Sequence, residues 1–511
     1  MLSYTTTINY WRLNMNVSVP IYIHSTHVDI RADKDGYIGV MNGHIKYAIK
    51  QFSIDKFDVN TNKYIGSVRY HYYDGNEQIY RFPKYALKYI ETCFTKMKEF
   101  GIPVELEKVY IDPVETIDVD YRMQYWIKDR PGQKEAIEYL SSNKDMLACE
   151  AGTGFGKTTV SIKTAILKRV PFLVVCDGLM DQWKKNILEK TNIPENKIFI
   201  IQGSNSLLKL FKRIENNDKP IAIIGSIQTL RNYIKRETYP YTELPLWEEL
   251  LKILNIGIII KDEYHLNFNA YLLVDLFSNV KTNIYLSATP RRNDYQEAVM
   301  FNKIYPASIL GDRTNSKKHV EINLCGYKMF MDVNDSKFKT KYGYSQNIYE
   351  SFILKRPGKL TEYLQIIQNV ADSEYFNKYY PKEVKCVIFC YTKKMCKEVS
   401  NYLRSKHANY SIKTKLSEDP EENLNADVIV STIGSLGTGH DLSKLVTIIN
   451  TVSTKAQTKL EQVPGRLRPV EGYQCKYIDL YNDTLKFHRS HLYVKRRIYK
   501  ILADKYKEFN I

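Results

Sequence analysis

Short apolar runs alternate with stretches of helical periodicity through the middle of the chain. The runs that predict buried strands are residues 145–151, 171–176, 197–203, 220–226, 256–262 and 282–288. Between two of them, the segment that begins at Met180 places Trp183, Ile187 and Leu188 on the same helical face as Met180. Apolar strands that alternate with helices predict a parallel sheet covered on both faces.

The same pattern returns in the C-terminal part, after a mixed stretch at 306–383. Four further apolar runs predict strands at 385–391, 426–432, 445–451 and 475–481. The basic, aromatic-bearing segment 488–509 predicts a final helix. That helix either packs through Leu492, Ile498 and Leu502 or contacts phosphates with its cations, and the sequence leaves both open.

Tyrosine-rich segments of alternating polarity characterise the chain up to about residue 122. In one of them Asp74 and Gly75 separate two strand-like stretches, which predicts a hairpin. Arg69, His71 and Tyr73 fall on one face of the first strand. Such a face can stack bases, but tyrosines at strand spacing favour packing.

These patterns predict an α/β fold with two tandem parallel-sheet domains behind a small α+β or β-rich domain. The predicted segments are an accessory, DNA-binding domain at 1–122, a first α/β domain at 123–305, a linker and the start of the second domain at 306–383, and the remainder of the second domain with its basic helix at 384–511.

Composition narrows the partners and the compartment. Lys and Arg number 74 against 57 Asp and Glu, a net charge of +17 that favours a polyanionic partner, nucleic acid before an acidic membrane. The eight cysteines form no CxxC pairs, so neither a disulfide framework nor a zinc site is indicated. Without a long apolar run or a secretory signal, the chain is expected to be soluble and intracellular, with no membrane partner.

A glycine-rich turn, AGTGFGKTT, joins the strand at 145–151 to the next helix, in the order that a phosphate loop requires. Lys157 would neutralise the β- and γ-phosphates of a nucleotide, and Thr158 would coordinate Mg²⁺. Ala151 stands where the strict pattern has its first glycine, and the alternative is a glycine-rich turn that binds nothing. The candidate nucleotide-binding residues of the loop are Gly152, Thr153, Gly154, Gly156, Lys157, Thr158 and Thr159.

Adjacent carboxylates, Asp262 and Glu263, follow three consecutive isoleucines. Acids that cap a strand are common, but a later strand of a phosphate-loop domain brings its end to the same sheet edge. Asp262 would hold the metal there, and Glu263 would orient or deprotonate the attacking water. His265 is either a γ-phosphate sensor or a polar residue at a strand end.

The segments AGTGFGKT, DEYH and LSATP, in this order, resemble motifs I, II and III of the superfamily 2 helicases. Further segments resemble the remaining motifs between about 125 and 485, including VIFCYTKKMCKEV, VSTIGSLGTGHDL and EQVPGRLRP. The resemblance implies two RecA-like motor domains that use ATP and Mg²⁺. It implies nucleotide contacts by Arg130, Gln133, His265, Gly439, Asp441 and Gln462, and nucleic-acid contacts by Gln182, Trp183, Ser226, Gln228, Thr229, Ser287, Thr289 and Thr432.

Motif VI departs from the family pattern, in which two arginines lie three residues apart. Here Arg466 follows Gly465 as usual, but the second arginine is Arg468, directly before Pro469. Residues two apart on a helix point about 200° from each other, so both could face a γ-phosphate only if the helix has ended. Pro469 disfavours helical geometry at Arg468, and we expect Arg468 to be the arginine finger with Arg466 beside it.

Within the superfamily the chain resembles the phage UvsW-type, RecG-like enzymes, in its N-terminal layout and its basic C-terminal helix. That likeness implies an ATP-dependent DNA helicase or translocase that unwinds, anneals or branch-migrates branched or forked DNA in replication, recombination or repair, in the host cytoplasm if phage-encoded. A nucleic-acid-stimulated ATPase that acts on RNA or in transcript release, as in poxvirus-like helicases, is the second hypothesis. A binding protein that only keeps a motor fold is the third. The oligomeric state is left open.

Overall fold

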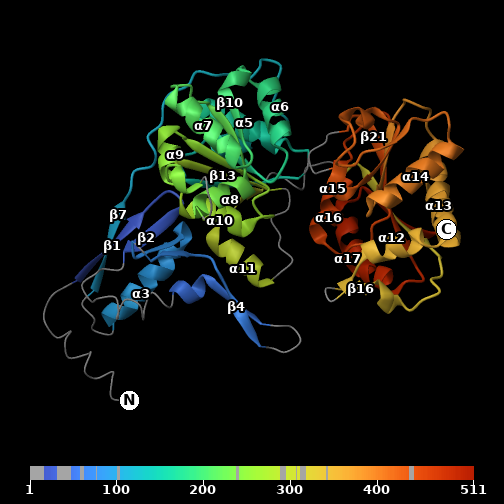
Figure 1. Cartoon of the computed structure of the whole chain (residues 1–511), viewed down its shortest axis with the longest axis horizontal. Coiled ribbons are helices and arrows are strands. Elements are labelled where there is room, and N and C mark those ends of the chain that lie inside the picture. The colour runs from blue at the N-terminus through green and yellow to red at the C-terminus, as the bar shows by residue number, and fades with distance from the viewer. Residues whose placement is uncertain are drawn as a thin grey trace. The chain divides into compact units, whose positions relative to one another are not determined.

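The structure is a computed structural model of the whole chain. It describes residues 17–31, 48–57, 63–75, 77–99, 104–152, 154–236, 241–287, 295–305, 308–310, 318–340, 343–436 and 442–511. The chain divides into two compact units, one of residues 1–151 and 155–311 and one that includes residues 312–511 (Figure 1). The finer boundaries at 122, 305 and 383 stay predictions.

An N-terminal sheet precedes the first parallel sheet. Its strand order is β5 (Tyr72–Asp74), β6 (Ile79–Pro83), β2 (His27–Arg31), β1 (Val17–Ile23) and β7 (Val104–Tyr110). The predicted hairpin at Asp74 is confirmed, because β5 and β6 pair antiparallel with Asp74 opposite Ile79. A second hairpin joins β3 (Ser53–Phe57) to β4 (Tyr64–Arg69), and helix α3 (Leu87–Glu99) lies between β6 and β7 in the chain.

The predicted alternation across 68–73 is wrong, because two strands of different sheets meet there. Strand β4 ends at Arg69, and β5 begins at Tyr72. Tyr70 between them is fully buried, and its ring stacks on Phe268 of the first parallel-sheet domain at a centroid distance of 5.1 Å. Tyr70 therefore packs in the core, as the tyrosine spacing favoured. Arg69, His71 and Tyr73 do not share one face of a single strand, because no single strand spans them.

The first parallel sheet has the order β10 (Ile198–Ile201), β11 (Ala222–Ser226), β9 (Phe172–Cys176), β12 (Ile258–Asp262), β13 (Thr282–Ser287), β8 (Met146–Glu150) and β14 (Ser308–Leu310). All of its neighbouring strands pair parallel, which confirms the six predicted strands and their class of sheet. Only the short edge strand β14 was not predicted.

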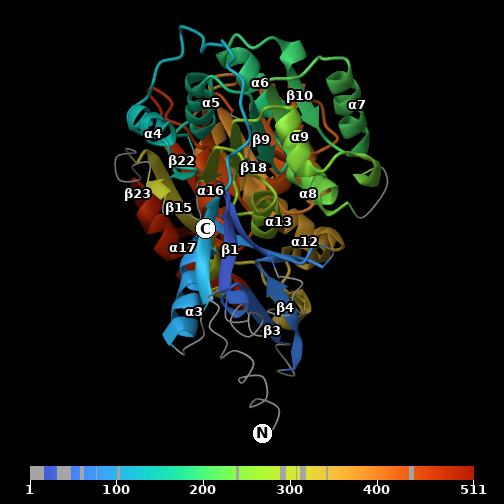
Figure 2. The same ribbon diagram turned by 90° about the vertical axis from the view of Figure 1, so that its left-hand side faces the viewer.

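Helices cover both faces of this sheet. Successive strand residues such as Leu173 and Val174 belong to different apolar clusters, as the twofold alternation of a strand requires. One face carries α4 (Gln133–Leu140), α5 (Lys157–Lys168) and α6 (Met180–Lys190), and the other carries α7 (Ser204–Glu215), α8 (Ile227–Lys235), α9 (Trp247–Ile253), α10 (Phe268–Leu276) and α11 (Tyr295–Ile304). Figure 2 shows α4 and α5 on one side and α7 and α8 on the other.

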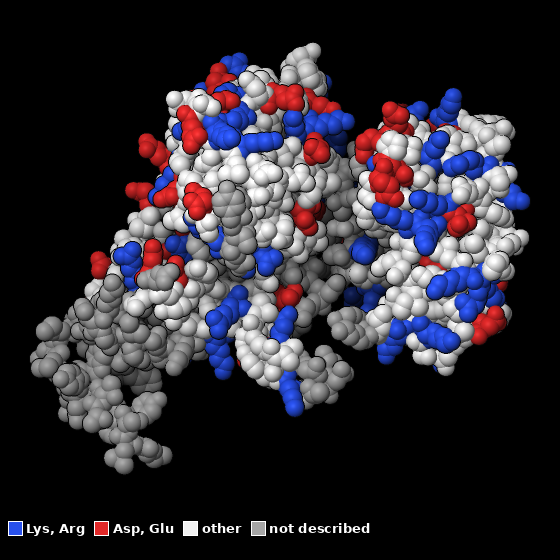
Figure 3. Space-filling model, in the orientation of Figure 1, with Lys and Arg blue, Asp and Glu red and all other residues white. Residues whose placement is uncertain are grey.

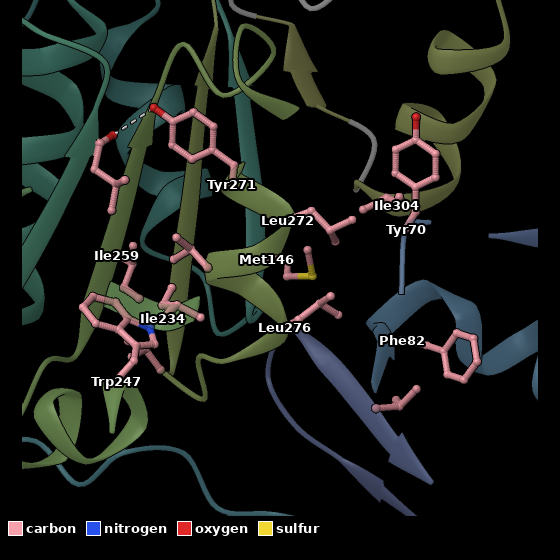
Figure 4. Packing of buried hydrophobic residues seen from close by; sticks show 14 of the residues in the cluster. Tyr70, Phe82, Met146, Ile234, Trp247, Ile259, Tyr271, Leu272, Leu276 and Ile304 are labelled. Atoms are coloured by element: carbon pink, nitrogen blue, oxygen red, sulfur yellow. Dashed lines mark hydrogen bonds between the residues drawn. The ribbon is translucent and has the colours of Figure 1, made fainter. Parts of the chain in front are cut away.

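One apolar cluster joins the N-terminal sheet to the first parallel-sheet domain. Figure 4 shows Tyr70 and Phe82 on one side of α10, and Trp247 and Ile259 on the other. All four side chains are at most 4% exposed, so the N-terminal sheet shares a continuous core with the first parallel-sheet domain.

The second unit holds another parallel sheet of seven strands. Its order is β19 (Ile412–Thr414), β20 (Val428–Thr432), β18 (Lys385–Cys390), β21 (Leu445–Asn450), β22 (Cys475–Asn482), β15 (Val320–Tyr327) and β23 (Lys505–Asn510). One face carries α12 (Gln346–Leu354), α13 (Pro357–Ala371) and α14 (Lys393–Lys406), and the other carries α16 (Gln457–Gln462) and α17 (Lys486–Leu502). The four predicted strands are confirmed.

The predicted C-terminal helix ends earlier than expected. Helix α17 stops at Leu502, and residues 505–510 form the edge strand β23. Leu492 and Ile498 are buried, which confirms that the helix packs on the sheet. Part of its charge is neutralised internally, since Lys495 Nζ lies 2.9 Å from Asp479 and Arg496 lies 2.7 Å from Glu508.

None of the described helices combines the length and apolar character that a membrane-crossing segment needs.

Candidate active site

The glycine-rich loop connects β8 to α5 at the carboxyl edge of the first sheet. Gly154 and Gly156 have φ values of 92° and 89°, in the left-handed region that favours glycine. At Gly156 a Cβ atom would also lie 2.5 Å from Gln133 Nε2. Ala151, in contrast, is buried and does not have a left-handed φ. The position at which the sequence departs from the strict pattern therefore does not need glycine.

Lys157 begins α5 and points back over the loop. Its Nζ donates to the carbonyl of Ala151 at 2.9 Å and lies 4.0 Å from Glu263 Oε1. The side chain is largely buried, with 11% of it exposed. A lysine at the N-terminus of a helix, next to a glycine-rich loop, suits an anionic ligand such as a nucleotide phosphate.

The two acids lie close to this loop because of the strand order. Strands β12, β13 and β8 are neighbours and parallel, so their carboxyl ends share one edge. Asp262 ends β12, and its Oδ2 accepts a hydrogen bond of 2.9 Å from the Trp183 indole. Trp183 on α6 is only 2% exposed, so the indole acts as a fixed donor to Asp262. The helical face predicted for α6 placed Trp183 in the core but gave no sign of this bond.

Glu263 has an unusual backbone. Its φ is 46°, a left-handed value that is costly for a non-glycine residue and that clusters at functional sites. Its Oε2 lies 3.4 Å from His265 Nδ1, and that same nitrogen lies 2.8 Å from the Ser287 hydroxyl. Lys157, Glu263, His265 and Ser287 thus form one polar network that joins the loop, β12 and β13.

The pKa of Asp262 is raised to about 6, chiefly by burial and in addition by the neighbouring Glu263 carboxylate, while the Trp183 hydrogen bond acts in the opposite direction. A nearby cation would relieve the same unfavourable charge. Thr158 and Asp262 offer a hydroxyl and a carboxylate, the oxygen donors that Mg²⁺ prefers, so the residues present fit a magnesium site.

Gln133, one of the predicted nucleotide contacts, lies beside the loop. Its Oε1 accepts from the Arg130 N–H at 2.9 Å, and its Nε2 donates to the Phe155 carbonyl at 2.5 Å. Thr159 accepts from Lys190 Nζ at 2.7 Å. Nucleotide contacts by Arg130, Gln133 and Thr159 stay predictions.

The residues of the first unit that were predicted to contact nucleic acid differ in how exposed they are. Gln228 on α8 is exposed, and Gln182 and Ser226 are half-buried. Trp183, Thr229 and Ser287 are buried and make internal hydrogen bonds, and their nucleic-acid contacts stay predictions. Thr229 accepts a hydrogen bond from the Gly203 N–H at 2.9 Å. Trp183 is hydrogen-bonded to Asp262, and Ser287 is hydrogen-bonded to His265.

In the second unit, motif VI leaves the helix before either arginine. Helix α16 ends at Gln462, and residues 464–466 form a short 3-10 turn. The expected helix end is confirmed, although Pro464 and not Pro469 marks it, because proline has no N–H for the helix. The backbone of Leu467 is then extended, with φ −66° and ψ 120°.

The two arginines have different surroundings. Burial lowers the pKa of Arg466 to about 10, with the Arg468 charge acting in the same direction, and Arg466 Nε has no hydrogen-bond partner among the described residues. The Arg466 guanidinium lies 5.9 Å from the Phe389 ring centre, while Arg468 donates to the Gly465 carbonyl at 2.9 Å. Two neighbouring guanidinium groups favour an anion beside them.

Thr432, another predicted nucleic-acid contact, ends β20. Its hydroxyl accepts from the Ser435 N–H at 2.9 Å and thereby caps the short helix α15 (Ile433–Leu436). Four other predicted site residues lie outside the described ones: Thr153, Thr289, Gly439 and Asp441.

Comparisons with known proteins match part of the chain to a family model and find two similar proteins. Residues 127–292 match the family model described as "Type III restriction enzyme, res subunit", and this segment holds both the glycine-rich loop and the two acids. The chain is 22% identical over 430 residues to the helicase candidate 161L of Invertebrate iridescent virus 6, across 80% of this chain and 87% of the viral protein. It is also 22% identical over 299 residues to the DNA repair protein rhp54 of Schizosaccharomyces pombe, across 51% of this chain and 31% of rhp54.

Similar solved structures include UvsW of bacteriophage T4, with a TM-score of 0.35 and 14% identity, across 97% of this chain and 100% of that chain. Dbp5 of S. cerevisiae bound to RNA and ADP BeF3 has a TM-score of 0.49 and 14% identity, across 75% of this chain and 90% of that chain.

Proposed function

We propose that this chain is a superfamily 2 helicase that couples ATP hydrolysis to movement along DNA, a proposal supported by its motifs and by the family match of residues 127–292. The observation that carries the proposal is the network of Lys157, Glu263, His265 and Ser287 at one sheet edge. It links the phosphate loop to the strand end at Ser287, so a change at the nucleotide can reach the segment that follows β13.

In this proposal Lys157 neutralises the transferred phosphoryl group, and Glu263 orients the attacking water and accepts its proton. Mg²⁺ bound with the nucleotide would take the Thr158 hydroxyl and the Asp262 carboxylate as ligands and would supply further neutralisation of the phosphates. In this proposal Trp183 and His265 act as positioning residues, because they contact the two acids.

DNA is the proposed substrate because the chain is strongly basic and because its N-terminal layout and basic C-terminal helix resemble those of the UvsW-type enzymes. The net charge is +17, and Figure 3 shows Lys and Arg outnumbering Asp and Glu over the face of the second unit in view. The test is release of a labelled strand from forked DNA with ATP. We expect strand release with ATP and none with a non-hydrolysable analogue. Release from RNA duplexes alone would favour the second hypothesis, an RNA-directed ATPase.

Binding to DNA should depend steeply on salt. If several Lys and Arg side chains neutralise phosphates, the slope of log K against log[salt] on duplex DNA is about −0.9 per neutralised phosphate. We expect weak sequence preference, because backbone contacts carry no base information. Fluorescence anisotropy at several salt concentrations measures the slope. An affinity that does not change with salt, or strong discrimination between two sequences of one shape, would contradict this mode of binding.

The Trp183 hydrogen bond should set the acid limb of activity. As the pH falls through the Asp262 pKa, the carboxyl group becomes protonated and no longer binds a cation. At pH values below about 6, kcat/KM for ATP should therefore decrease. Trp183→Phe removes the donor that favours the carboxylate, and its acid limb should shift to higher pH.

The matched control is Trp247→Phe, since Trp247 is also buried in this unit but donates to Ser278 at 3.1 Å. It should leave the midpoint of the acid limb unchanged. If Trp183→Phe lowers activity equally at every pH, the indole has only a packing role.

A further inference from the structure

Two histidines and an aspartate converge where β1 turns into β2. His24 Nε2 lies 3.7 Å from Asp29 Oδ2, and His27 Nε2 lies 3.7 Å from Asp29 Oδ1. One candidate ligand atom from each residue lies within 4.8 Å of those of the other two. The imidazole rings stack with centroids 4.1 Å apart, so both edges can face the same point.

The polar atoms of this cluster are poorly satisfied. His27 is 1% exposed and Asp29 is 6% exposed. Within the described part of the chain, His27 Nε2, Asp29 Oδ1 and His24 Nδ1 are buried and have no hydrogen-bond partner. Buried polar atoms without partners are costly, and each such atom calls for a ligand, a water molecule or an ion.

A cavity opens beside the two imidazoles. Its volume is about 310 Å³, and it is lined by His24, His27, residues 111–115 and side chains of the motor domain that include Glu248 and Asn279. A three-residue ligand set leaves coordination positions to be filled, and a cavity of this size has room for water at those positions.

Arg81 lies near one oxygen of Asp29, which leaves the other oxygen, Oδ1, available to a metal ion. Arg81 Nε lies 3.5 Å from Asp29 Oδ2, while the Arg81 guanidinium also forms an ion pair with Glu248. Two carboxylates therefore share the Arg81 charge, and Asp29 Oδ1 stays on the histidine side. Lys252 also lines the cavity and would weaken a cation site to some extent.

Burial keeps both imidazoles neutral at pH 7, the form that binds metals. It lowers the pKa of His24 to about 4 and that of His27 well below the usual value, and it raises the pKa of Asp29 to about 7.

We infer that His24, His27 and Asp29 bind one divalent transition-metal ion. Two imidazole nitrogens and one carboxylate oxygen suit Zn²⁺ and related ions, whereas Mg²⁺ and Ca²⁺ prefer ligand sets made only of oxygen. The alternative is a polar cluster that only fills the junction between the two sheets.

The ion would strengthen the attachment of the β1–β2 turn to the motor domain. Between the two histidines, Thr26 Oγ1 donates to the carbonyls of Asp275 and Ser278 at 2.7 and 2.5 Å, and the Ser25 N–H donates to Asn279 Oδ1 at 2.9 Å. An ion that fixes His24 and His27 would fix this turn on the end of α10. Zn²⁺ should therefore raise the unfolding temperature of the full chain.

The test is a titration of the tag-free, chelator-treated full chain with Zn²⁺, in competition with a chromophoric chelator. We expect one Zn²⁺ per chain, and Co²⁺ in its place should show the visible absorption bands of a nitrogen- and oxygen-ligated ion. His24→Ala and Asp29→Asn should each weaken Zn²⁺ binding by about 100-fold or more, because each removes one of only three ligands. The control His71→Ala alters a half-buried histidine of the same unit outside the cluster and should bind as the wild type does.

Circular dichroism and metal-free unfolding temperatures show whether each variant is folded. A folded Asp29→Asn protein that has lost both the binding and the Zn²⁺-dependent rise in unfolding temperature supports the site. Absence of stoichiometric binding by the wild type, or equal binding by wild type, His24→Ala and Asp29→Asn, would overturn it. Neither readout depends on ATP hydrolysis, so the result is independent of the proposed function.

Discussion

Replacing Glu263 by glutamine is expected to lower ATP turnover by about 100-fold or more while ATP still binds. The substitution keeps the size of the side chain but removes the group that would accept the proton of the attacking water, and such a base contributes about 10²–10⁴-fold. Glu263 is placed for this role by its left-handed backbone and its contact with His265. Steady-state phosphate release and binding of a fluorescent ATP analogue measure the two effects.

Lys157→Ala should abolish turnover in a different way, because it removes the cation that neutralises the phosphates and so weakens ATP binding as well. Lys163→Ala is the matched control. Lys163 lies on the same helix but pairs with Asp129 at 2.6 Å, and its loss should leave turnover unchanged. Full hydrolysis by Lys157→Ala or by Glu263→Gln would contradict the assignment of the loop.

Replacing Arg468 by alanine should lower nucleic-acid-stimulated hydrolysis by about 10³-fold or more, the usual contribution of an arginine finger. In this hypothesis the second motor domain supplies the charge that stabilises the transition state. ATP binding should survive, because it rests mainly on the phosphate loop of the first domain. The backbone is extended at Leu467, between Arg466 and Arg468. Helical geometry therefore does not force the two side chains to point in opposite directions.

The control for Arg468 is Arg489→Ala, an exposed arginine on α17 of the same unit, which should retain stimulated turnover. Arg466→Ala tests which of the two arginines is the finger. Arg466 is the more buried of the two, and its Nε has no partner among the described residues. If Arg468→Ala keeps full stimulated turnover and only Arg466→Ala is inactive, the roles of the two arginines are reversed.

The strands of both parallel sheets could be predicted where they are continuous apolar runs. Strand β15 was missed because Glu321 and Asn323 interrupt its apolar pattern, although both are buried. Glu321 is satisfied there by Asn323 at 3.2 Å and by Lys507 of β23 at 3.1 Å. A buried polar pair of this kind depends on a strand almost 200 residues away, so no local pattern can reveal it.

In the candidate site, too, some features follow from local sequence and others depend on residues far apart in the chain. Glycine positions, Lys157 and the two acids follow from local spacing, and the structure brings Lys157 and Glu263 together. The roles of Trp183 and Ser287 could not be predicted, because each depends on which strands are neighbours in the sheet. The family likeness suggested nucleic-acid contacts for both, and the structure shows in addition that both are buried and hydrogen-bond to Asp262 and His265.

The most direct test of the central claim is ATP turnover by the full-length chain, measured side by side without nucleic acid and with forked DNA, linear duplex DNA, single-stranded DNA and single-stranded RNA. The account predicts low turnover without nucleic acid and strong stimulation by DNA, with forked DNA the most effective, and loss of that stimulation in Glu263→Gln. Turnover that RNA alone stimulates would move the protein to the RNA-directed hypothesis. Absence of ATP hydrolysis with every nucleic acid would contradict the account.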